Sequence, residues 1–134
     1  MIYNLFISHS WTYSDAYEKL VALLDKEKNF TYKNYSVPKS DPIHNVHTKS
    51  QLKAAIRNQM QHASCVLILA GKYATYSEWI NVEIELAKEM DKKIIAIEPW
   101  GSERTSLVVK NNADEVVGWQ TSSIVKAIRG YSYS

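Results

Sequence analysis

The feature that most constrains the fold is an apolar run from Ser64 to Ala70, which reads Ser-Cys-Val-Leu-Ile-Leu-Ala. Its residues do not alternate between apolar and polar, so a strand formed there would present apolar side chains on both faces. Residues 93–98 form a second run of nearly the same kind. Strands that are apolar on both faces are typical of parallel sheets enclosed between two layers of helices. We therefore expect a central sheet with helices on both of its faces.

The rest of the chain alternates between strand and helix patterns. The expected strands are residues 2–8, 30–37, 64–70, 93–98 and 115–118. The expected helices begin at or just after Thr12, Thr48, Thr75 and Thr121. Polar loops are expected at 38–47 and 99–113, and a frayed tail at 131–134. This alternation predicts a single flavodoxin-like α/β domain over residues 1–134, with five parallel strands in the order 2-1-3-4-5.

Composition excludes several classes of protein. The net charge is +2 and the basic residues are scattered, which argues against nucleic acid and anionic membranes as partners. Cys65 is the one cysteine, so the chain cannot form an internal disulfide. No apolar stretch approaches the length of a membrane span, and the first residues lack a signal-peptide pattern, so a cytoplasmic protein is expected. His44 and His47 have no obvious further ligand, and no metal site is expected.

Glu83 lies where a carboxylate is not expected. At about 100° per residue, the apolar side chains of the expected helix 75–90 spread over one arc, and Glu83 falls near its middle. The apolar residues on that arc are Trp79, Ile80, Val82, Ile84, Leu86, Ala87 and Met90. Burial of an ionised carboxylate is costly unless it is paired or faces a cleft. Glu83 is therefore a candidate for a functional residue, and the alternative is a structural acid that caps or pairs locally.

Other polar and aromatic residues follow the expected strands, at the edge where parallel sheets of this kind bind ligands. They include Ser8, His9, Ser10 and Trp11 after the first strand, Tyr76, Ser77 and Trp79 after the third, then Trp100 and Trp119. Aromatic rings, hydroxyls and one carboxylate together suit a flat, sugar-bearing ligand. The alternative for Trp100 and Trp119 is that they only cover the end of the sheet. His9 is either a general base or a hydrogen-bonded structural histidine, and Asp41 before Pro42 is a turn residue or a ligand contact.

Several segments together resemble a TIR-type domain. Residues 6–9, Phe-Ile-Ser-His, resemble the first-strand signature of that family. Residues 77–83 resemble its third-helix motif, in which a glutamate follows a tryptophan by four positions. Residues 70–77, 99–101 and 117–119 are similar, more narrowly, to the TIR-like subunits of bacterial Thoeris anti-phage systems.

This resemblance implies an enzyme that cleaves the bond between nicotinamide and ribose in NAD and releases a cyclic ADP-ribose isomer as a signal. It implies Glu83 as the catalytic residue. The residues that it implies for substrate binding are Phe6, Ser8, His9, Tyr76, Ser77 and Trp79. Two positions depart from the family pattern. Ile80 replaces the usual cysteine after the motif tryptophan. The loop after the second expected strand lacks the glycine common in the family, so the contacts by which that loop assembles other members cannot be inferred for this chain.

The resemblance also implies partners. NAD would be a substrate, with no separate cofactor. Self-association on activation and a downstream effector reached through the small-molecule signal are expected, and a phage protein is a candidate trigger. Two other functions stay open. One is a non-enzymatic module that binds another protein, with Glu83 as a buried structural acid. The other is an enzyme like the nucleoside deoxyribosyltransferases, which have a similar fold and glutamate.

Overall fold

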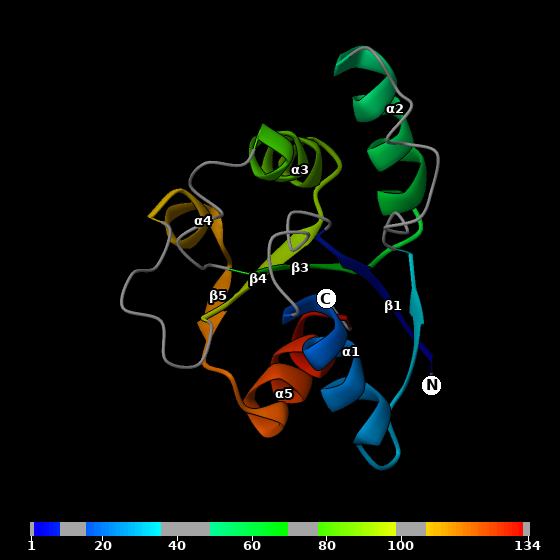
Figure 1. The fold of residues 1–134 in the computed structure, drawn as a ribbon, viewed down its shortest axis with the longest axis vertical. Helices are drawn as coiled ribbons and strands as arrows, with labels where there is room; N and C mark the ends of the chain where they lie inside the picture. The colour runs from blue at the N-terminus through cyan, green and yellow to red at the C-terminus, as the bar shows by residue number, and fades with distance from the viewer. Residues whose placement is uncertain (1, 9–15, 36–48, 70–77, 99–106, 133–134) are drawn as a thin grey trace.

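A five-stranded parallel sheet in the order β2-β1-β3-β4-β5 organises the chain (Figure 1). The computed structural model describes residues 2–8, 16–35, 49–69, 78–98 and 107–132. The strands are β1 (Ile2–Ile7), β2 (Thr31–Asn34), β3 (Cys65–Leu69), β4 (Lys93–Ile97) and β5 (Glu115–Val117). The strand order and the parallel pairing of every neighbouring pair confirm the predicted topology.

Helices lie on both faces of this sheet (Figure 1). They are α1 (Ala16–Lys26), α2 (Lys49–Met60), α3 (Glu78–Glu89), α4 (Leu107–Asn112) and α5 (Thr121–Ser132). One apolar cluster joins α2, α3 and α4 to one face of the sheet, and a second joins α1 and α5 to the other face. Each sheet face is therefore sealed by its own layer, as the two continuous apolar runs require.

Helix α3 is buried over most of its circumference. Its exposed positions among the described side chains form one polar stripe, made of Asn81, Glu85, Lys88 and Glu89. Two ion pairs along this stripe tie α3 to α2. Lys53 contacts Glu85 at 3.0 Å, and Arg57 contacts Glu89 at 3.1 Å. At its carboxyl end Asp91 adopts φ 57°, and the Lys92 N–H donates to the Ala87 carbonyl oxygen at 2.7 Å, which closes the helix with a left-handed cap.

The prediction that residues 99–113 form only a loop was wrong, because Leu107–Asn112 form α4. The helix has six residues, and its sequence has no full apolar periodicity to reveal it. Its formation depends on tertiary contact. Val109 is completely buried against the cluster that contains α2 and α3, and the Asn112 amide donates to the Val108 carbonyl oxygen at 2.7 Å.

The prediction of a frayed tail over residues 131–134 was wrong for Tyr131 and Ser132, because α5 continues to Ser132, and residues 133–134 lie outside the described residues. The Tyr131 hydroxyl donates to the Asp114 carbonyl oxygen at 3.1 Å, and its ring packs on the apolar cluster shared with α1. Partial burial, together with the nearby Glu115 carboxylate, raises the pKa of Tyr131 above its usual value. A tyrosine hydroxyl is protonated at neutral pH even at its ordinary pKa, so the hydroxyl is a donor here.

Gly130 provides a test of this longer helix. A methyl group added there would meet no atom within 4 Å, and glycine is a poor helix former. We expect Gly130→Ala to raise the free energy of unfolding by about 0.5 kcal/mol, measured by urea denaturation. Lys126→Ala, at an exposed position of the same helix, is the control and should change little. A loss of stability in Gly130→Ala would argue against helix at this position.

Phe6 provides a second test, of packing beneath α3. Its side chain is completely buried in the cluster shared with α2, α3 and α4. We expect Phe6→Ala to cost about 3–5 kcal/mol of unfolding free energy, and Phe6→Leu clearly less. Ile2→Ala, at the half-exposed start of the same strand, should cost less than about 1 kcal/mol. A fully stable Phe6→Ala protein would contradict a packing role for this ring.

Candidate active site

Ser8 marks the carboxyl end of β1. Its backbone N–H donates to the Leu67 carbonyl oxygen of β3 at 2.9 Å, so the residue is anchored between the two strands. Strand β1 pairs with β2 on one side and with β3 on the other. After β1 the chain adds β2 on one side, and the later strands β3 to β5 lie on the other side. Ligand sites of open α/β sheets form at such switch points in the strand order. Ser8 is therefore placed where a ligand site is expected.

Glu83 approaches the same point from α3. Its side chain is completely buried, which confirms the position in the apolar arc that the helical pattern predicted. The Ser8 hydroxyl donates to the Glu83 carboxylate Oε1 at 3.1 Å. Among the side chains that the structure describes, Ser8 and Glu83 are the two buried polar ones. The apolar layer beneath α3 thus contains a paired hydroxyl and carboxylate, separated by 75 positions in the sequence.

Phe6 lies on the same sheet face as Ser8, because side chains two positions apart in a strand point to the same side. Its ring belongs to the apolar cluster beneath α3. The backbone of Trp79 lies in the first turn of α3, one helical turn before Glu83. The other predicted binding residues, His9, Tyr76 and Ser77, fall outside the described residues, as do Asp41 and Trp100.

Trp119 lies after β5 and is partly buried against the cluster that contains α1 and α5. This is the sheet face opposite to the one that α3 covers. The contact agrees with the alternative in which this ring covers the end of the sheet.

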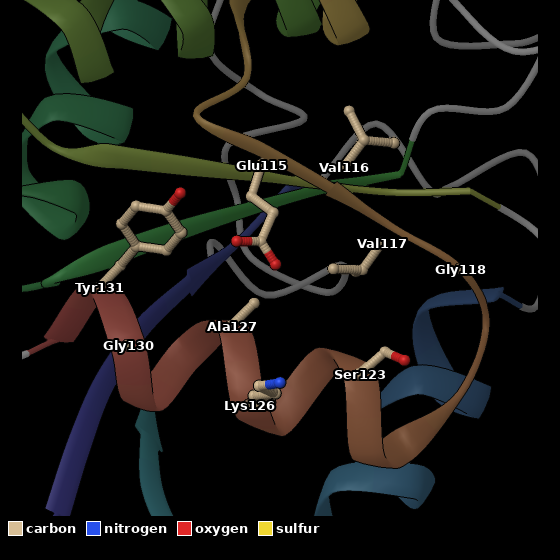
Figure 2. A pocket seen from close by; sticks show the side chains of 9 residues that line it. All are labelled: Glu115, Val116, Val117, Gly118, Ser123, Lys126, Ala127, Gly130 and Tyr131. Carbon is tan, nitrogen blue, oxygen red and sulfur yellow. The ribbon is translucent and has the colours of Figure 1, made fainter.

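A separate groove, with a volume of about 650 Å³, lies between β5 and α5 (Figure 2). Its described lining includes Glu115 and Val117 from the strand, and Lys126 and Tyr131 from the helix. None of the predicted site residues belongs to this described lining. The groove and the Ser8–Glu83 pair are therefore two distinct features of the fold.

The described segments contain neither a metal-binding cluster nor a membrane-spanning helix. Within those segments, no three histidine, cysteine, aspartate or glutamate side chains are grouped so that they could hold a metal ion. No helix in the same segments has the length and apolar character needed to cross a membrane.

Solved structures with the same fold differ widely in sequence. A conserved protein from Enterococcus faecalis V583 is 12% identical, with a TM-score of 0.65, and the match covers 97% of this chain and 99% of that one. The CMP N-glycosidase BcmB from Clostridium botulinum is 16% identical, with a TM-score of 0.55, over 96% and 99%. A prokaryotic SEFIR domain is 17% identical, with a TM-score of 0.51, over 97% and 96%. At these identities the matches establish the fold alone.

Sequence comparison is more specific. No curated protein matches the chain. The model of the TIR-like domain of the Thoeris protein ThsB matches residues 6–104, a segment that includes both Ser8 and Glu83. Because this segment spans most of the sequence, the chain belongs to the family of TIR-like domains of the Thoeris protein ThsB and is a defence-related TIR-like protein.

Proposed function

We propose that the protein is an NAD-consuming enzyme in which Glu83 is the catalytic residue. The observation that carries the proposal is a completely buried carboxylate at the switch point of the sheet, hydrogen-bonded to Ser8. Polar groups that break the apolar pattern of a core are concentrated at functional sites. Membership of a TIR-like family supports NAD as the substrate, because other TIR-type enzymes cleave it.

The chemistry of NAD makes one carboxylate sufficient. Glycosidases normally need a second carboxyl group to protonate the leaving group. In NAD the pyridinium nitrogen already carries a positive charge, so the bond between ribose C1′ and that nitrogen can break with both electrons moving to nitrogen. Nicotinamide then leaves as a neutral molecule, and the positive charge stays on the ribose. The Glu83 carboxylate would stabilise this oxocarbenium-like centre electrostatically.

The attacking nucleophile decides the product. Water would add its oxygen to C1′, lose a proton and give ADP-ribose. A hydroxyl or ring nitrogen of the same molecule would instead close a ring and give a cyclic ADP-ribose isomer. An internal nucleophile held close has a high effective concentration, so exclusion of water favours the ring. We propose the cyclic product as the signal to a downstream effector, since Glu83 lies in an apolar, water-poor layer.

Burial of Glu83 also bears on regulation. Its side chain has no exposed surface, so NAD can reach it only after the site opens. We propose that a trigger, such as self-association or a phage protein, promotes this opening. Protein that has not met the trigger would then cleave NAD slowly, so the decisive assay is made in phage-infected cells.

We expect Glu83→Gln to lower NAD cleavage by at least about 100-fold, because the neutral amide cannot stabilise positive charge on the ribose. The measurement is mass spectrometry of nicotinamide and ADP-ribose isomers in infected cells that express either form of the protein. Lysates of infected cells, supplied with NAD, CMP or deoxynucleosides, distinguish NAD cleavage from the other N-glycosidic reactions when wild type and Glu83→Gln are compared.

Glu85→Gln is the matched control, since Glu85 lies on the exposed stripe of the same helix. It should leave the product level unchanged. If Glu83→Gln accumulates as much product as the wild type, Glu83 is not catalytic. If deoxynucleosides or CMP are cleaved and NAD is not, the substrate assignment is wrong.

Stability separates catalysis from the alternative of a non-enzymatic interaction module. If Glu83 is a structural acid, its change to glutamine would lower the free energy of unfolding of the protein by about 1–3 kcal/mol. For a catalytic acid we expect Glu83→Gln to be neutral or slightly more stable by urea denaturation, because removal of a buried charge lowers the cost of folding. A clear loss of stability together with unchanged NAD levels in infected cells would favour the interaction module.

A further inference from the structure

We propose that Ser8 is a positioning residue that orients the Glu83 carboxylate, and that it does not serve as a substrate-binding residue. The proposal rests on the proposed function of Glu83 and deepens it. The resemblance to TIR-type domains placed Ser8 among the groups that line the substrate pocket. The geometry of the described residues points to a different role.

The Ser8 hydroxyl uses its proton in a hydrogen bond to Glu83. A serine hydroxyl has a single proton to donate. In this structure that proton is directed to Glu83 Oε1, at an oxygen–oxygen distance of 3.1 Å. While this bond is made, Ser8 cannot also donate to a ribose hydroxyl or a phosphate of NAD. Ser8 could then contact the substrate only as an acceptor, and its completely buried side chain offers no surface for such a contact in this structure.

Ser8 is a rigidly held donor. The Ser8 N–H is bonded to the Leu67 carbonyl oxygen, and its side chain is completely buried. A glutamate side chain has three rotatable bonds, so a fixed donor at one carboxylate oxygen restricts the orientations that it can adopt. Catalytic groups are effective only when neighbouring residues hold them close to the productive geometry.

Ser8 also bears on the charge of Glu83. The proposed mechanism needs Glu83 in its ionised form, and its apolar surroundings disfavour that form. A hydrogen bond donated to a carboxylate favours the ionised state and is stronger than a bond between neutral groups. Ser8 therefore acts on catalysis through Glu83 in two ways, by orientation and by stabilising the charge.

The test compares the kinetics of NAD cleavage, at a series of NAD concentrations, in desalted lysates of phage-infected cells that express equal amounts of wild type, Ser8→Ala or Ser8→Thr. A positioning role predicts that kcat falls by about tenfold or more in Ser8→Ala while KM stays nearly constant. Ser8→Thr keeps the hydroxyl and should recover most of kcat. Ser123→Ala, in α5 on the other face of the sheet, is the serine control and should match the wild type.

The opposite kinetic result would overturn the proposal. If KM for NAD rises in Ser8→Ala while kcat is kept, Ser8 contacts the substrate and does not act through Glu83. Equal kcat and KM in all variants would show that the hydroxyl has no role in the reaction. If Ser8→Ala does not fold, Ser8→Cys takes its place, because a thiol is a weak donor of similar size.

A second measurement does not depend on NAD turnover. A double-mutant cycle combines Ser8→Ala with Glu83→Met and measures the equilibrium constant of unfolding in urea. A coupling of about tenfold or more between the two positions supports Ser8 as the partner that holds the carboxylate. Independent effects would overturn it. Coupling in a protein that never cleaves NAD would instead reject the proposed function and keep the Ser8–Glu83 interaction.

Discussion

The hydrogen bond from Ser8 to Glu83 is the interaction on which the interpretation of this fold depends. It joins the end of strand β1 to the middle of α3, across a layer that is otherwise apolar among the described side chains. Apolar side chains of similar size, such as alanine for Ser8 and methionine for Glu83, would fill the layer without any cost of dehydrating a charge. The presence of a carboxylate in this layer therefore needs a reason other than stability, and chemistry at the switch point of the sheet is such a reason.

The surroundings of the pair are built to hold it in place. Strand β1 is hydrogen-bonded on both sides, to β2 and to β3, so Ser8 extends from a strand that is held by two neighbours. Helix α3 is tied to α2 by the ion pairs Lys53–Glu85 and Arg57–Glu89 on its exposed stripe. Exposed pairs of this kind add little free energy, but two of them one helical turn apart favour a single register between the helices.

Much of this arrangement could be predicted from the sequence. The doubly apolar runs of β3 and β4 predicted a parallel sheet, and the helical period alone placed Glu83 within a buried arc. Helix α4 could not be predicted, because its six residues fold only against α3 and β4. The end of α5 was missed because Gly130 reads as a helix stop, whereas the contact of Tyr131 with Asp114 extends the helix beyond it. The Ser8–Glu83 bond was also beyond sequence reasoning, since no periodicity relates residues on different elements.

The same burial that identifies Glu83 also limits what the resting protein can do. A carboxylate without exposed surface is protected from water, and water is the competitor that would divert an oxocarbenium ion towards simple hydrolysis. It is equally protected from NAD, so one static conformation cannot both exclude water from Glu83 and admit the substrate to it. The proposed function, in which a signal is made only after infection, has a use for this conflict. In that proposal the closed state is silent, and a trigger that binds the open state more tightly than the closed state shifts the population towards it and admits the substrate. Because Ser8 is anchored to the sheet rather than to the substrate, the orientation of Glu83 can be kept through such an opening as long as the Ser8–Glu83 hydrogen bond is kept.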